Sequence, residues 1–227
     1  RDFRAAPLYG LFFASVYVAG GWLIVYALTV SGQVWWTLPA GAGFPILGPF
    51  IACGLYEVSR RLEQGAPLDW RGVLGVVIRQ KDRQIPSIAA VVVVFFLFWN
   101  FLAHMIFALF LGLQAMTNIT SSLAVFLTPN GMMMLVVGGL VGAVFAGVLF
   151  SLTVVSLPLL LDREMDFVTA MITSVSVVLS NPLVMLVWGG LIAGLIFVGM
   201  AFWFLGLFVV LPVLGHASWH LYRRVLN

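Results

Sequence analysis

The chain has 227 residues, of which 63% are hydrophobic and 8% are charged, and its mean hydropathy is +1.13. A soluble domain carries about 25% charged residues, so this chain cannot cover itself with polar side chains, and lipid must form part of its solvent. The net charge of +3 would fit nucleic acid in a soluble protein. In a membrane protein, basic residues orient the chain and contact anionic lipid headgroups, so we exclude nucleic acid as a partner.

Long uncharged stretches predict the fold class. Residues 8–30, 84–161 and 167–222 carry no charge, and each stretch exceeds the roughly 20 residues that cross about 30 Å of hydrocarbon. Only helices and closed barrels satisfy the backbone in lipid, and the alternating ten-residue segments of a barrel are absent. The sequence therefore predicts an all-α polytopic membrane protein with a single membrane domain, residues 1–227.

We predict six crossings in chain order. The first four lie at 8–30, 38–56, 86–112 and 132–157. The last two share residues 183–222, because one helix of that length would be about 60 Å long, twice the bilayer. They are expected to meet at a tight turn near Gly199 to Gly206. Four crossings with buried re-entrant pieces remain the alternative.

Two further helices are predicted to lie along the cytoplasmic interface, at residues 69–81 and 166–180. Each combines an apolar face with polar positions, as interfacial helices do. Each starts at an aspartate that can cap it and ends before a proline suited to the first turn of the next crossing. These residues are Asp69 and Pro86 for the first helix, and Asp166 and Pro182 for the second.

The distribution of charge predicts the orientation. All lysines and arginines fall in four clusters, and the turns at 31–37 and 115–131 carry no charge. By the positive-inside rule the clusters face the cytoplasm, which places both termini there. The first uncharged run is too long for the apolar region of a signal peptide, so we expect it to be a retained helix. The four clusters are 1–4, 60–83, 163 and 223–224.

Two segments 163 residues apart follow one template. Residues 49–61 align without a gap on residues 212–224. Each has a proline, polar residues four and eight places on, an aromatic at seven and two arginines at eleven and twelve. A weaker third copy begins at Pro158. Hairpin, polar template and interfacial helix together predict three repeated units, approximately 5–85, 86–181 and 182–227, in a pseudo-threefold bundle.

The template gathers the candidate ligands. His216 and His220 are spaced i, i+4, which puts both imidazoles on one helical face, as in zinc sites. Cys53 and Glu57 take the same template positions in the first copy, and Asp162 takes the first of them in the weaker copy. If the units pack around an axis, these five side chains could converge at the cytoplasmic end and bind zinc, or copper if Cys53 joins.

Two other interpretations of the template residues stay open. They could be interfacial polar residues with hydrogen-bond partners, with Glu57 paired to Arg60 or Arg61. They could instead line a path for protons or a substrate.

A second polar pair lies at membrane depth. Asn100 and His104 share one helical face, and an ionisable residue at this depth is a functional candidate. The alternative is a structural role, in which an Asn100–His104 hydrogen bond satisfies the histidine and the pair only packs between helices. His104 lies about 27 Å beyond Pro86 along its helix, so it and His216 differ in level by about 20 Å and cannot share one haem iron. A haem held by a single histidine remains open.

Four motifs resemble a bacterial family of predicted integral membrane proteins of unknown function, and the resemblance covers essentially the whole chain. The motifs are Ala6-Pro-Leu-Tyr-Gly10, Phe44-Pro-Ile-Leu-Gly-Pro-Phe50, Leu55-Tyr-Glu-Val-Ser-Arg-Arg61 and Gly215-His-Ala-Ser-Trp-His-Leu-Tyr-Arg223. The resemblance implies a bacterial inner membrane. Members are often labelled cytochrome c oxidase subunit I-like. That catalytic core needs about six histidines to hold two haems and a copper, and this chain has three.

The sequence holds no Gly-rich phosphate loop, nucleophile elbow or Ser-His-Asp series. We therefore expect a non-enzymatic membrane protein, an accessory or assembly subunit of a larger complex. Its partners would be membrane lipids and other membrane-protein subunits, with a homo-oligomer left open. The alternatives are a small transporter or binder with a metal or proton site at the cytoplasmic end, and a haem-binding redox protein.

Overall fold

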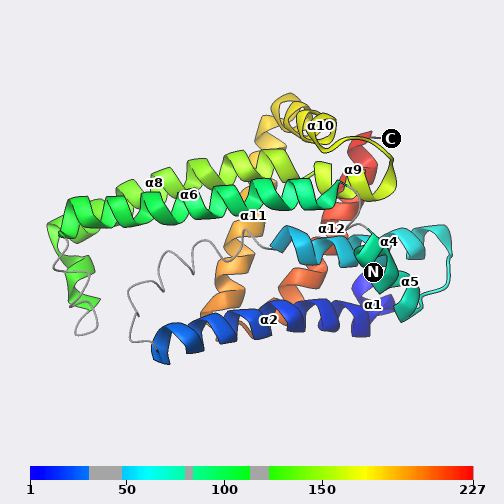
Figure 1. The fold of residues 1–227 in the computed structure, drawn as a ribbon, viewed down its shortest axis with the longest axis horizontal. Helices are drawn as coiled ribbons and strands as arrows, with labels where there is room; N and C mark the ends of the chain where they lie inside the picture. Colours follow the sequence, from blue (N-terminus) through cyan, green and yellow to red (C-terminus); the bar gives the residue numbers. More distant parts are fainter. Residues whose placement is uncertain (31–47, 80–83, 113–122, 227) are drawn as a thin grey trace.

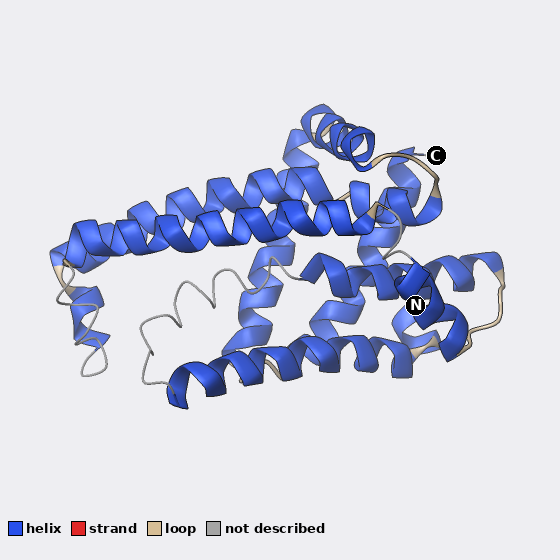
Figure 2. Ribbon diagram, viewed as in Figure 1, coloured by secondary structure: helices blue, strands red, loops and turns tan. Residues whose placement is uncertain are grey.

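The computed structural model describes residues 1–30, 48–79, 84–112 and 123–226, and every regular element in these ranges is helical (Figure 2). This confirms the all-α class. The elements are α1 (Asp2–Ala5), α2 (Pro7–Val30), α4 (Gly48–Gln64), α5 (Trp70–Arg79), α6 (Ile85–Leu111), the 3-10 helix η5 (Leu123–Leu127), α8 (Pro129–Thr153), α9 (Ser156–Asp162), α10 (Phe167–Ser180), α11 (Pro182–Ala201) and α12 (Leu207–Leu226).

Four helical stretches in the described ranges are long and apolar enough to cross a membrane. They are α2, α6, the stretch Pro129–Asp162 that contains α8 and α9, and α11. The other two predicted crossings are not among them. Of the second, residues 38–47 lie outside the described residues, as do the predicted turn 31–37 and much of the turn 115–131. The sixth corresponds to α12, whose second half carries histidines and arginines.

The division of residues 183–222 into two helices is confirmed. α11 ends at Ala201 and α12 begins at Leu207, so the chain reverses over five residues. Trp203 and Phe204 adopt positive φ angles of 53° and 64° in this turn. The amide of Phe204 donates to the carbonyl of Met200, which closes the end of α11.

Both short helices predicted from aspartate–aromatic pairs are present, and both have the predicted caps. Asp69 accepts a hydrogen bond from the amide of Gly72 at 2.7 Å, at the start of α5. Asp166 accepts one from the amide of Thr169 at 2.8 Å, at the start of α10. The prolines at 86 and 182 lie in the first turns of α6 and α11. The interfacial position of α5 and α10 stays a prediction.

The helices form two groups joined at one end (Figure 1). One group is the pair α6 and α8, and the other contains α2, α4, α11 and α12. α6 and α8 lie side by side, while α12 packs against both α2 and α4. Two glycines permit the close approach of this second group: a Cβ at Gly54 would overlap the ring of Phe13, and one at Gly215 would lie 2.6 Å from Leu55 Cδ1. α9 and α10 connect the groups, because α9 contacts α4 and α12 and α10 contacts α8 and α11.

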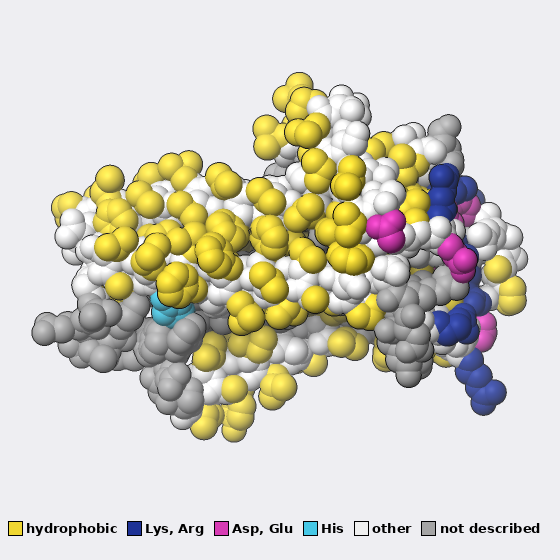
Figure 3. All heavy atoms as spheres, turned by 45° about the horizontal axis from the view of Figure 1, so that its top comes forward, with side chains coloured by type: hydrophobic (Ala, Val, Ile, Leu, Met, Phe, Trp, Pro, Cys, Tyr) yellow, Lys and Arg dark blue, Asp and Glu magenta, His cyan; other side chains and the backbone are white. Residues whose placement is uncertain are grey.

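Both termini lie at the end of the molecule where α4, α9 and α12 meet (Figure 1). On the face drawn in Figure 3, basic and acidic side chains gather at this same end, and the long sides are mainly hydrophobic. We call it the charged end. A bundle with lipid-facing sides and one charged end is what the charge clusters predict.

Candidate functional site

Polar side chains of α1, α4, α9 and α12, with the α5 cap Asp69, lie together at the charged end in separate hydrogen-bonded groups, which we jointly call the polar end network. It consists of Asp2, Glu57, Ser59, Arg60, Arg61, Glu63, Asp69, Asp162, His216, Trp219, His220, Tyr222 and Arg223. The close packing of α12 on α4 brings these residues together from opposite ends of the sequence.

Glu57 is fully buried, with no exposed surface. Arg60 donates to its carboxylate through Nε and Nη2, at 2.7 and 3.0 Å, and Arg61 Nε donates at 2.7 Å. The bond to Glu57 raises the pKa of Arg60 although burial opposes the rise. Arg61 continues to the carbonyl of Pro67 at 2.9 Å and to Asp69 at 3.1 Å. A buried charge needs such compensation, and here it also ties α4 to the cap of α5.

A second branch of the network joins both histidines to α1 and α4. His220 Nε2 lies 2.8 Å from Asp2 Oδ2, and His216 Nδ1 lies 2.7 Å from Ser59 Oγ. Each histidine is therefore held by a polar side chain of another helix, His220 by α1 and His216 by α4. Burial alone would raise the pKa of Asp2, but the bonds from His220 and Ser59 outweigh it and hold the pKa below 3.8.

The Nδ1 atom of His216 is engaged by Ser59 Oγ. In the tautomer whose Nδ1–H donates to Ser59, Nε2 is the unprotonated nitrogen. His216 is 5% exposed, and its Nε2 is buried with no hydrogen-bond partner in the described part of the chain. A free imidazole lone pair of this kind can take up a proton or a metal ion.

A third branch joins the end of α12 to α4 and α9. Asp162 accepts from the hydroxyl of Tyr222 at 2.8 Å and from Arg223 Nη1 at 3.4 Å. Glu63 accepts from Trp219 Nε1 at 3.0 Å and from Arg223 Nε at 3.1 Å. Of these residues, the sequence pattern singled out Asp162 as a ligand. Trp219 and Arg223 were marked by their template positions alone. No pattern in the sequence indicated their distant partner Glu63 or the bond of Tyr222 to Asp162.

The predicted metal ligands therefore have separate partners. Glu57 binds arginines, Asp162 binds Tyr222 and Arg223, and the two histidines bind Ser59 and Asp2. Cys53 is 4% exposed and lies in an apolar cluster with residues such as Tyr56 and Val155. Across the described ranges no three His, Cys, Asp or Glu side chains lie close enough to hold one metal ion. The predicted pairing of Glu57 with Arg60 and Arg61 is present. The interfacial position of Glu57 and a zinc or copper site stay predictions.

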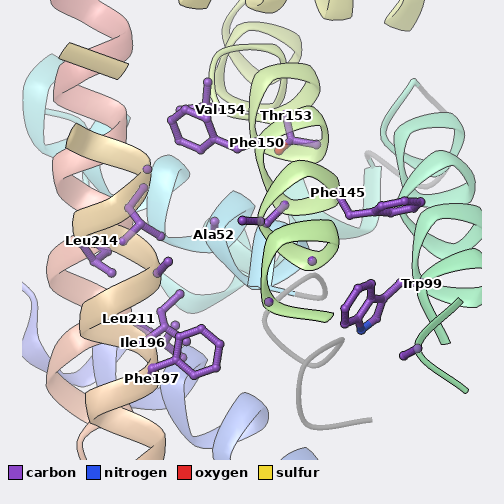
Figure 4. Close-up of a pocket in the computed structure, with 18 of the residues that line it drawn as sticks. Ala52, Trp99, Phe145, Phe150, Thr153, Val154, Ile196, Phe197, Leu211 and Leu214 are labelled. Atoms are coloured by element: carbon purple, nitrogen blue, oxygen red, sulfur yellow. The ribbon is translucent and has the colours of Figure 1, made fainter. Parts of the chain in front are cut away.

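Asn100 and His104 both bond to the backbone of their own helix. His104 Nδ1 lies 2.6 Å from the carbonyl oxygen of Asn100, and Asn100 Nδ2 donates to the carbonyl of Phe96 at 2.8 Å. The expected Asn100–His104 contact is thus made through the Asn100 backbone. His104 also lines a cavity of about 700 Å³ between α6, α8 and the helices α4, α11 and α12 (Figure 4).

The family model described as "Predicted integral membrane protein (DUF2189)" matches residues 37–162, more than half of the chain. The match includes Cys53, Glu57 and Asp162 and stops before the two histidines of α12. No curated protein and no solved structure matches the chain. The chain therefore belongs to this family of predicted integral membrane proteins, whose function is unknown.

Proposed function

We propose that the protein is a non-enzymatic integral membrane protein and serves as an accessory or assembly subunit of a larger membrane complex. The observation that carries the proposal is the engagement of the charged candidates by protein side chains. Glu57, Asp162 and Asp2 each accept hydrogen bonds from neighbouring residues. Asp162 and Asp2 join α9 and α1 to α12, and Glu57 holds two arginines of its own helix, so none of the three is poised as a nucleophile with its acid or base.

The proposal includes six crossings in three hairpin units, with both termini on the cytoplasmic side of a bacterial inner membrane. The order of the elements supports the three units. α2, α4 and α5 are followed by α6, α8 with α9, and α10, and then by α11 and α12. The common end of both termini and the basic clusters supports the orientation, because cytoplasmic ends carry the excess of arginine and lysine.

Isolation of the protein from its membrane tests the accessory role. The tagged chain would be extracted in a mild detergent and its particle mass measured by native mass spectrometry. We expect a particle that contains other membrane subunits in fixed ratio. A monomer, or a homo-oligomer of this chain alone, would count against an accessory role.

One observation favours a second function, the binding of a proton or a metal ion at the charged end. The lone pair on His216 Nε2 is buried and without a partner in the described ranges. Elemental analysis of the purified protein and of His216→Ala tests this function. One zinc or copper ion per chain that is lost in the variant would support metal binding. The absence of a stoichiometric metal in the wild-type protein would rule metal binding out. The absorption spectrum of the same sample tests the haem alternative, since a haem held by His104 would give a Soret band.

A further inference from the structure

Helix α5 carries two arginines that no carboxylate in the described ranges engages. Arg71 and Arg79 are exposed, whereas the arginines of the polar end network pair with acidic side chains. Asp69, two residues before Arg71, is held by Arg61 and by the amide of Gly72. The positive charge of α5 is therefore available to an external anion.

Both arginines lie on one side of α5. Positions 71, 75 and 79 share a helical face, and the buried residues Val73 and Val76 lie on the opposite one. The side chain of Arg79 runs back along the shared face, since its Nη1 lies 3.4 Å from the position that a Cβ on Gly75 would take. Apart from the helix's own neighbouring residues, no other atom in the described ranges lies within 4 Å of that position. Arg71 and Arg79 are about 12 Å apart along the axis, so two long side chains can meet over Gly75 around one anion.

The ring of Trp70 indicates the level of α5 in the membrane. It stacks on the ring of Tyr9 with centroids 4.1 Å apart and contacts Phe12 edge-on at 5.2 Å. Tyr9 and Phe12 lie in the first two turns of α2, which is long and apolar enough to cross a membrane. Trp70 is 41% exposed, and tryptophans are enriched where the hydrocarbon meets the headgroups. α5 therefore lies beside the start of a membrane span (Figure 1), at the level of lipid phosphates.

An apolar surface of α2 continues from Trp70 along the span. Leu8, Phe12 and Val16 follow each other at a spacing of four, so they form an exposed ridge on one helical face. The contact between Phe12 and Trp70 joins this ridge to α5. A phospholipid can lay its hydrocarbon chains on the ridge while its phosphate lies at α5, whereas inorganic phosphate gains nothing from an apolar neighbour.

We propose that α5 binds the phosphate group of one anionic phospholipid from the leaflet at the charged end. Arg71 and Arg79 donate to the phosphate oxygens over Gly75, because a guanidinium group forms paired hydrogen bonds to such oxygens. The hydrocarbon chains lie beside Trp70 and along the ridge of α2. A headgroup such as choline would bring its own positive charge to two arginines, so an anionic headgroup is favoured. The site rests on the membrane placement of the charged end proposed above, and not on the accessory role.

Three variants separate a site from the general attraction of positive charge for anionic lipid. Arg71→Gln and Arg79→Gln each remove one guanidinium group and keep a polar side chain. Arg224→Gln is the matched control, because Arg224 is also exposed and without a carboxylate partner in the described part of the chain. It lies at the end of α12, which Figure 1 places away from α5. Circular dichroism would establish that each variant keeps the helical content of the wild type.

Native mass spectrometry of the detergent-solubilised protein would measure binding of dioleoyl phosphatidylglycerol. Dioleoyl phosphatidylcholine, which has the same chains, is the second probe, and inorganic phosphate is added as a competitor. We expect one phosphatidylglycerol per chain and binding of phosphatidylcholine that is weaker by about ten-fold or more. An arginine at a membrane surface contributes about five-fold to the binding of anionic lipid. The affinity should therefore fall about five-fold in Arg71→Gln and in Arg79→Gln, about 25-fold in the double variant and less than about two-fold in Arg224→Gln.

Equal losses of affinity in Arg224→Gln and Arg71→Gln would overturn the proposal, because charge alone would then explain the binding. So would phosphatidylcholine bound as tightly as phosphatidylglycerol, or no binding of phosphatidylglycerol. Displacement of the lipid by inorganic phosphate at equal concentration would also overturn it, since the site would then take a free anion. Each of these results leaves the accessory role to be decided by the particle mass.

Discussion

The substitution Glu57→Gln removes the buried charge that Arg60 and Arg61 share, with little change of shape. Removal of one member of a buried ion pair lowers stability by about 3–5 kcal/mol. The side chains of Arg60 and Arg61 are 26% and 16% exposed, and Arg61 keeps its bonds to Pro67 and Asp69. We therefore expect Glu57→Gln to lower the free energy of unfolding by the lower value of this range, about 3 kcal/mol. In a chain of this length that corresponds to a fall in Tm of about 6–12 °C.

The assay is thermal unfolding in detergent, followed by circular dichroism, with Glu63→Gln as the control. Glu63 also pairs with an arginine of the network, Arg223, but the two side chains are 37% and 32% exposed. An exposed pair contributes about 0–1 kcal/mol, so this variant should lose no more than about 4 °C. Equal falls in Tm in the two variants would refute the reasoning that burial makes the ion pairs of Glu57 contribute more stability than the exposed pair of Glu63.

Three further predictions follow from particular contacts. Asp2→Asn should lower the free energy of unfolding at neutral pH. Because the pKa of Asp2 in the folded protein lies below its ordinary value, the loss of stability relative to wild type should fade as the pH falls through that folded pKa. A loss that persists at the lowest pH of the unfolding curves would contradict this. Gly215→Ala should cost about 1–3 kcal/mol through overlap with Leu55, while Gly147→Ala should cost nothing measurable in the same unfolding assay. Green fluorescent protein fused after residue 227 should fluoresce, since the C-terminus is expected in the cytoplasm. A non-fluorescent fusion, together with an active alkaline phosphatase fusion at the same position, would place the C-terminus on the opposite side.

The sequence predicted those parts of the fold that depend on local signals. Uncharged length located the apolar helices, and an aspartate before an aromatic residue located the starts of α5 and α10 because capping is a local interaction. The charges that disfavour lipid also make α12 less apolar than α2, α6, α8 and α11. For this reason the template that identified the polar residues of α12 also makes its membrane crossing hard to establish from composition.

The site was predictable only where its contacts are local. Glu57 meets Arg60 and Arg61 three and four residues away, so helical spacing was enough to foresee the pair. The bonds of His220 to Asp2 and of Trp219 to Glu63 join residues that are 218 and 156 positions apart. Such partners depend on how α12 packs against α1 and α4, which no local pattern encodes. Cys53 has the template position of a ligand, but the orientation of α4 places it in an apolar cluster.

A double-mutant cycle between Ser59 and His216 tests most directly whether the polar end network joins helices. The cycle compares Ser59→Ala, His216→Phe and the double variant by unfolding in detergent. Residues in one hydrogen-bonded network couple by about 0.5–3 kcal/mol, and we expect a coupling in this range across the α4–α12 contact. Losses that add to within about 0.5 kcal/mol would show no coupling. That result would contradict a fastening role and leave His216 with a role other than joining α12 to α4.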